Sequence, residues 1–226
     1  MLHKAIVAVS FAVAAIATPV PSAACHDYVI LSSRGTGEPQ GPSVGFLGMI
    51  KTTLAAVPNG IEYDVVYPAA ADLTQQSTFI GSRDIERYVN DGLKACPQQK
   101  YALLGYSQGA TVTLEAFQNL TGSAANAIKA VVLIGNPYQV KNQAVTVDQF
   151  GGGLTRPNDG ILLPLAGTLN LSPKLPENGK ALNICYVGDP VCNGIAYTIT
   201  SPAHLAYGAS PGVQKLGSDF LISKLG

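Results

Sequence analysis

The chain has 226 residues, of which 47% are hydrophobic and 12% are charged, whereas a typical globular protein has about 25% charged residues. Its 14 basic and 14 acidic residues cancel to a formal net charge of zero, so no electrostatic attraction to nucleic acid or to an anionic membrane is expected. The length and the apolar content suit one folded domain.

The first residues carry the pattern of a secretory signal peptide. Lys4 is followed by the mostly apolar run 5–17, then by two prolines and a stretch of small residues. The prolines end this run well short of the roughly 20 apolar residues that a membrane-spanning helix needs. We therefore expect residues 1–24 to be removed and residues 25–226 to form a single secreted domain with no integral membrane segment.

After this leader, short apolar runs alternate with helical patterns, which is typical of β-α-β proteins with a buried parallel sheet. The segment 136–180, before the last expected strand, is long and irregular, and it is either an ordinary surface insertion or a part that covers or lines a binding site. In chain order we expect a strand over 27–33, a helix over 42–57, a strand over 61–67, a helix over 78–95, a strand over 100–105, a helix over 108–120, and strands over 130–135 and 181–187.

The four cysteines all follow the expected leader. An even number of cysteines in a secreted chain is typical of disulfides. Closeness along the chain favours a bond between Cys185 and Cys192, which leaves Cys25 to pair with Cys96. No Cys-x-x-Cys pair occurs and histidines are few, so we expect no bound metal.

Residues 105–109 have the sequence Gly-Tyr-Ser-Gln-Gly and join an expected strand to an expected helix. This matches the Gly-x-Ser-x-Gly nucleophile elbow, in which the glycines make room for a sharp turn that exposes the serine hydroxyl. A serine nucleophile also needs a general base and a carboxylate that orients the base. In proteins with this elbow, the three residues occur in the chain order serine, acid, histidine.

Only one of the three histidines fits this order. His3 lies in the leader, and His26 precedes the first strand, opposite the strand ends that carry active sites. His204 follows Ser107, and among the carboxylates between them only Asp189 comes directly after an expected strand. We therefore predict that Ser107 is the nucleophile, His204 the base and Asp189 the residue that orients the base, with an acyl-enzyme intermediate.

Two backbone N–H groups are the expected oxyanion donors. One belongs to Gln108, which follows the nucleophile, and the other to Thr36, in the turn 34–41 after the first strand. The glycine spacing of this turn misses the dinucleotide-binding motif by one residue, and secretion argues against a nucleotide. We expect no cofactor.

Taken together, these residues resemble the cutinase family of secreted serine esterases, which also includes acetylxylan esterases. The resemblance spans nearly the whole mature chain. It implies a compact α/β-hydrolase, a three-layer sandwich around a central five-stranded parallel sheet, with the same triad, oxyanion donors and disulfides. The chain departs from compact cutinases, which have an open site, in the length of segment 136–180, and it has threonine at 36 where serine is frequent. The resemblance is carried by Arg34-Gly35-Thr36, by residues 105–109, by Cys185-x3-Asp189-x2-Cys192 and by His204-Leu205-Ala206-Tyr207-Gly208.

The leading hypothesis is a secreted, monomeric, cofactor-free serine esterase. It would act on cutin-like polyesters of the plant surface or on esters of short to medium acyl chains, for which the apolar residues near His204 are suited. One alternative is an acetylxylan esterase that uses the same residues to deacetylate plant polysaccharide. Another is a catalytically inactive protein that binds lipid or a plant surface, which the intact set of three residues argues against.

Overall fold

The computed structural model describes residues 25–72, 75–195 and 199–226, so the expected signal peptide lies outside the described residues. The strands are β1 (Tyr28–Ser33), β2 (Gly60–Asp64), β3 (Lys100–Tyr106), β4 (Ile128–Ile134), β5 (Thr146–Val147) and β6 (Ala181–Ile184). They form one parallel sheet in the order β2-β1-β3-β4-β6-β5. Thr36, Ser107 and Asp189 follow β1, β3 and β6, so this topology brings them to one end of the sheet.

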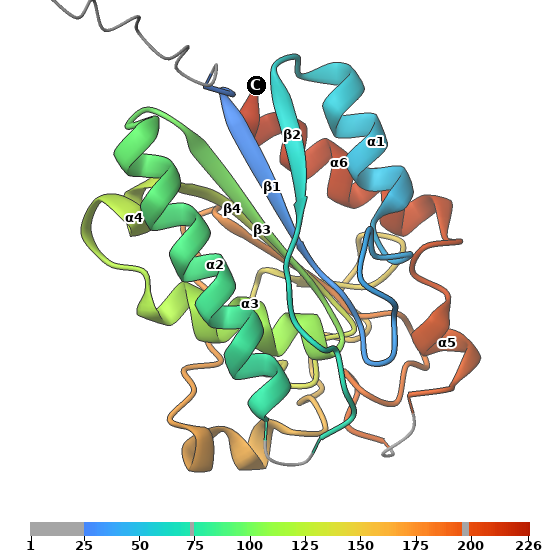
Figure 1. Ribbon diagram of the computed structural model, residues 1–226. Coiled ribbons are helices and arrows are strands. Elements are labelled where there is room, and N and C mark those ends of the chain that lie inside the picture. Colours follow the sequence, from blue (N-terminus) through green and yellow to red (C-terminus); the bar gives the residue numbers. More distant parts are fainter. Residues whose placement is uncertain (1–24, 73–74, 196–198) are drawn as a thin grey trace, which may run out of the picture.

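Helices cover both faces of the sheet and make a three-layer α/β hydrolase (Figure 1). They are α1 (Leu47–Ala56), α2 (Gln76–Ala95), α3 (Gln108–Asn119), α4 (Gly122–Ala127), α5 (Pro202–Leu205) and α6 (Pro211–Leu225), with a 3₁₀ helix, η1 (Leu163–Leu169). Helices α2 and α3 pack together on one face, and α1 and α6 pack together on the other.

Strand β3 shows how the sequence fills two cores at once. Tyr101 and Leu103 pack in the core beneath α2 and α3, while Ala102 and Leu104 pack in the core beneath α1 and α6. All four side chains are fully buried. Because successive side chains of a strand point to opposite faces, a strand covered on both sides is apolar throughout. The short apolar runs of the sequence are therefore central strands.

The sheet has six strands, so the expectation of five was wrong by one. The additional strand is β5, which is two residues long, lies within segment 136–180 and pairs with β6. The last expected strand, 181–187, ends at Ile184 because the chain then turns toward Asp189. Segment 136–180 is also part of the core, since its buried Ala166 and Leu171 pack beneath α2 and α3.

Helix α1 begins at Leu47, later than the expected start of 42–57. The Glu38 carboxylate accepts hydrogen bonds from the Val44 N–H, at 2.8 Å, and from the Ser43 hydroxyl, at 3.0 Å. These bonds hold the residues before Leu47 in a turn that is anchored to the preceding loop. The expected helix is therefore shortened by side-chain hydrogen bonds within the loop that precedes it.

Disulfides join Cys25 to Cys96 and Cys185 to Cys192. The first lies where the parallel strands begin, beside the end of α2, and the second closes the turn after β6. Disulfides are characteristic of extracellular proteins. In the part of the chain that the structure describes, no helix combines the length and the apolar character needed to cross a membrane.

Candidate active site

Ser107 lies in a sharp turn between β3 and α3 with φ 52° and ψ −114°. A positive φ is uncommon for a residue with a side chain and marks local strain. A Cβ on Gly105 would lie 2.3 Å from the Gly109 carbonyl oxygen, and a Cβ on Gly109 would lie 2.1 Å from the Ser33 carbonyl oxygen. Both positions therefore require glycine, which lets α3 start directly against β1 and β3 and raises Ser107 above the sheet.

Ser107, His204 and Asp189 form one chain of hydrogen bonds. His204 Nε2 lies 2.9 Å from Ser107 Oγ, and His204 Nδ1 lies 2.9 Å and 3.0 Å from the two carboxylate oxygens of Asp189. The exposed fractions are 5% for Ser107, 2% for His204 and 0% for Asp189. With its proton on Nδ1 donated to the carboxylate, the imidazole presents the Nε2 lone pair to the serine hydroxyl.

The buried Asp189 carboxylate has two further donors besides His204. The Val191 N–H donates to Oδ1 at 2.8 Å, and the Tyr207 hydroxyl donates to Oδ2 at 2.6 Å. The side-chain amide of Asn193 donates to the Asp189 carbonyl oxygen at 2.7 Å. A buried charge is tolerated when it is hydrogen-bonded in this way. The turn that the Cys185–Cys192 disulfide closes therefore holds the Asp189 carboxylate oriented toward His204.

Tyr106, directly before Ser107, holds the loop of His204. Its hydroxyl donates to the His204 carbonyl oxygen at 2.7 Å, and its ring centroid lies 5.5 Å from that of the imidazole. Burial, with the charges of Glu38 and Asp189, raises the pKa of Tyr106, so the hydroxyl remains a donor. Sequence reasoning assigned no role to Tyr106, although its place inside the elbow motif was a signal that it lies near the site.

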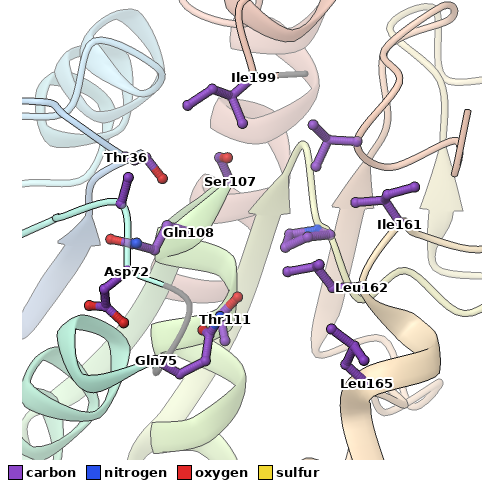
Figure 2. Close-up of a pocket in the computed structure, with 13 residues that line it drawn as sticks. Thr36, Asp72, Gln75, Ser107, Gln108, Thr111, Ile161, Leu162, Leu165 and Ile199 are labelled. Carbon is purple, nitrogen blue, oxygen red and sulfur yellow. The ribbon is translucent and has the colours of Figure 1, made fainter. Parts of the chain in front are cut away.

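Thr36 and Gln108 line the same pocket as Ser107, and Figure 2 shows the three together at one end of it. The N–H of Gln108 opens α3, so it has no acceptor within the helix and is available to an oxygen beside Ser107. The Gln108 side chain donates to the Ala70 carbonyl oxygen at 2.7 Å. This bond ties the elbow to the loop before α2.

The turn that carries Thr36 is fixed by a buried arginine. Arg34 donates through Nη1 to the Glu38 carbonyl oxygen and through Nη2 to Gln40 Oε1 and the Tyr67 carbonyl oxygen. Its guanidinium also lies 4.8 Å from the centroid of the Tyr67 ring. Sequence reasoning used Arg34 only as part of a motif. Its position directly after the apolar run 28–31 and two small serines was the signal that it lies at the end of a buried strand.

Ser107 lies between two cavities. The larger has a volume of about 300 Å³ and runs between Gln75 and Thr111 on one side and the apolar Leu162 and Leu165 on the other (Figure 2). Segment 136–180 therefore lines the site, which decides between the two interpretations given above. The smaller cavity, of about 200 Å³, has His204, Tyr106, Leu205 and Val44 among its lining residues.

The other titratable candidates have separate surroundings. The Asp148 carboxylate accepts backbone N–H groups of its own loop. Glu115 accepts the Thr78 hydroxyl at 3.0 Å, and burial raises its pKa to about 7. His26 lies where β1 begins, away from Ser107. Among the described residues, no group of three or more His, Cys, Asp or Glu side chains is arranged to hold a metal ion.

The parallel sheet and the serine at a strand-to-helix elbow, with a histidine hydrogen-bonded to the serine and an aspartate hydrogen-bonded to that histidine, define an α/β-hydrolase of the serine esterase class. The Cutinase family model matches residues 24–225. The chain therefore belongs to the cutinase family, as the sequence resemblance indicated.

Individual relatives agree with this assignment. The chain is 29% identical over 204 residues to carboxylesterase Culp1 of Mycobacterium tuberculosis, which covers 89% of this chain and 82% of that one. It is 32% identical over 151 residues to a cutinase of Hypocrea jecorina, with 62% and 60% covered. The family and these relatives make the chain a serine carboxylic ester hydrolase.

Solved structures show the same fold. A cutinase-like protein from Cryptococcus sp. is similar with a TM-score of 0.79 and 39% identity, over 92% of this chain and 98% of that one. The catalytic core domain of acetyl xylan esterase from Trichoderma reesei has a TM-score of 0.69 and 21% identity, over 89% and 100%. At 21% identity, the similarity to the acetyl xylan esterase domain shows a shared fold alone.

Proposed function

We propose that Ser107 is the nucleophile, His204 the general base and Asp189 the orienting carboxylate of carboxylic ester hydrolysis, with Thr36 and Gln108 as oxyanion donors. The observation that carries the proposal is the continuous hydrogen-bonded chain from Ser107 Oγ to the buried Asp189, which opens on an apolar cavity. Such a chain activates a hydroxyl that is otherwise a weak nucleophile.

Acylation follows from this geometry. Ser107 Oγ bonds to the ester carbonyl carbon while its proton passes to His204 Nε2, and the carbonyl oxygen becomes an oxyanion that the N–H groups of Thr36 and Gln108 stabilise. The bond between the acyl carbon and the alcohol oxygen then breaks, and that oxygen takes the proton from Nε2. Asp189 remains ionised and stabilises the transient imidazolium.

Deacylation repeats these steps with water. His204 Nε2 takes a proton from the water, whose oxygen bonds to the acyl carbon and forms a second oxyanion. The bond to Ser107 Oγ breaks, and Oγ takes the proton back from His204. The products are the carboxylic acid, the alcohol and the starting enzyme. Because Ser107, His204 and water supply every proton and bond in this cycle, the proposed reaction needs no cofactor.

We assign the alcohol and the acyl chain of the ester to different cavities. The leaving alcohol oxygen must approach His204, because it takes the proton from Nε2. His204 lines the smaller cavity, so we place the alcohol there and the acyl chain in the larger cavity beside Leu162 and Leu165. At about 30 Å³ per non-hydrogen atom, a water's share of liquid volume, the acyl cavity of about 300 Å³ holds on the order of ten atoms.

A cavity of this size supports a preference for esters of short to medium acyl chains over a preference for acetyl esters alone. Val44, Ile199 and Leu205 are exposed around the serine, which favours apolar substrates such as cutin-like polyesters of the plant surface. We propose that the protein works there as a secreted monomer of residues 25–226, after loss of the signal peptide 1–24.

Hydrolysis of p-nitrophenyl acetate, butyrate and palmitate by residues 25–226 tests this proposal, with Ser107→Ala as the control. Turnover that is highest on butyrate and lost in the variant is the expected result. Turnover of acetate alone, together with release of acetate from acetylated xylan, would replace the proposal by an acetylxylan esterase. No turnover of any ester would leave the alternative of a binding protein.

A further inference from the structure

We infer that Tyr207 is a positioning residue for this reaction: its hydroxyl holds the Asp189 carboxylate in the orientation in which it directs His204. The inference rests on the proposed roles of Ser107, His204 and Asp189. Sequence reasoning included Tyr207 in a family motif without giving it a task.

The Tyr207 hydroxyl contacts the Asp189 carboxylate directly. Tyr207 donates to Asp189 Oδ2 at 2.6 Å, the same oxygen that lies 2.9 Å from His204 Nδ1. The Val191 N–H occupies the other oxygen, Oδ1, at 2.8 Å. A carboxylate held by a separate donor at each oxygen cannot rotate about its Cβ–Cγ bond without losing a bond. Tyr207 and Val191 together therefore fix the plane in which Asp189 receives His204.

The direction of this hydrogen bond follows from the other partner of the phenol. The Tyr186 N–H donates to the Tyr207 hydroxyl oxygen at 3.0 Å, so the phenol already accepts one bond and its own proton is free to be donated. Tyr207 is 0% exposed, and this burial, together with the Asp189 charge, raises its pKa well above the ordinary value. The phenol therefore stays neutral and directs its proton to Asp189.

The fold also couples Tyr207 to His204. Both residues belong to the segment around α5, and their rings meet edge-on at 87° with centroids 6.3 Å apart. Gly135, at the end of β4 with φ 59°, makes room for the pair, since a Cβ there would lie 2.9 Å from His204 Cε1 and 3.2 Å from Tyr207 Cε2. Gln214 Nε2 anchors the segment by donating to the Tyr207 carbonyl oxygen at 2.9 Å.

A purely structural role for Tyr207 is the competing explanation, and Tyr28 provides a matched control. Tyr28 is also fully buried, and its hydroxyl donates at 2.6 Å to the Val57 carbonyl oxygen. It lies at the start of β1, the opposite end of the sheet from Ser107. Tyr28→Phe and Tyr207→Phe each remove a 2.6 Å bond donated by a buried hydroxyl and leave the ring. Tyr207→Phe also removes the acceptor of the Tyr186 N–H, and it is the variant that touches Asp189.

The first experiment measures kcat and KM on p-nitrophenyl butyrate for both variants, well below the unfolding midpoint of each. We expect Tyr207→Phe to lower kcat about 10-fold, the size of one charge-assisted hydrogen bond, with little change in KM. Tyr28→Phe should keep both constants and lose a similar amount of thermal stability. A kcat for Tyr207→Phe equal to that of Tyr28→Phe would overturn the inference.

The second experiment asks whether Tyr207 acts through Asp189. Labelling of Ser107 by a serine-directed phosphonate is timed for the wild type, Tyr207→Phe, Asp189→Asn and the double variant. If Tyr207 acts through the carboxylate, its replacement adds no further loss to Asp189→Asn. An equal fold-loss in both backgrounds would overturn the inference in favour of a packing role. Retention of turnover by Ser107→Ala would instead refute the proposed function, so the two failures are distinguishable.

Discussion

Cys185 and Cys192 are joined across the turn that holds Asp189, whereas the other disulfide, Cys25–Cys96, lies where the parallel strands begin. The separations are 7 and 71 residues, which correspond to about 2.5 and about 4.4 kcal/mol of loop-closure stabilisation. The smaller stabilisation thus belongs to the bond nearer the site.

We predict that alanine at both Cys185 and Cys192 lowers kcat, because Asp189 is less firmly held, and lowers stability moderately. Alanine at both Cys25 and Cys96 should lower stability more and leave kcat unchanged at temperatures where the protein is folded. Chemical denaturation and esterase kinetics on the two variants check this. Equal kcat values for both variants would argue against a role of the shorter loop in placing Asp189.

Substitutions of two buried carboxylates, Asp189 and Asp148, distinguish an effect on catalysis from an effect on stability. Asp189→Asn should reduce kcat by about 10³- to 10⁴-fold, because the amide cannot accept the Nδ1–H of His204 in the same way. Asp148→Asn should reduce stability and leave kcat within about 2-fold, because the Asp148 carboxylate serves only backbone N–H groups of Phe150, Gly152 and Leu154. A wild-type kcat in Asp189→Asn would contradict the proposed triad.

Glu115 gives a pH-dependent prediction. Burial raises its folded pKa to about 7, in spite of the hydrogen bond from Thr78 that lowers it. The folded state therefore binds a proton more tightly than the unfolded state, and the associated stability, complete below pH 4, is lost as the pH rises toward 7. Glu115→Gln should raise the unfolding temperature relative to the wild type increasingly between pH 5 and pH 8. A difference independent of pH would contradict this origin.

Leu165 tests which cavity receives the acyl chain. It lines the part of the larger cavity away from Ser107 (Figure 2), so Leu165→Ala should shift the preferred p-nitrophenyl ester to a longer chain and Leu165→Phe to a shorter one. Leu205, which lines the smaller cavity, is the control. Leu205→Ala should change the preference among alcohols of butyrate esters and leave the acyl preference unchanged. The opposite pattern would reverse the assignment of the cavities.

Much of the fold was predictable because its signals are local. The strands that became β1, β3 and β4 are largely apolar on both faces. The glycines at 105 and 109 belong to a motif of five consecutive residues, and Gly105 is required by a contact within that motif. The three candidates Ser107, Asp189 and His204 could be selected by element order alone, and the structure places them within hydrogen-bond distance.

The rest of the fold carries no periodic pattern that a prediction could use, or was missed. Strand β5 is two residues long and is defined by its pairing with β6. It is too short to show a periodicity in the sequence. The late start of α1 depends on the Glu38 carboxylate. Helix α6 was not among the expected elements, although Ser210, which caps its first turn, and Pro211 are a recognisable start signal. The hydrogen bond between the Tyr207 hydroxyl and Asp189 forms only when the turn that carries Asp189 is folded.

The most direct test of the central claim is covalent labelling of residues 25–226 with a serine-directed phosphonate, followed by peptide mass spectrometry and assay of p-nitrophenyl butyrate hydrolysis. The account predicts one label per molecule, on Ser107, with loss of activity in proportion to labelling and no labelling of a folded Ser107→Ala variant. Hydrolysis that persists in that variant, or a label on another residue that abolishes activity, would contradict it.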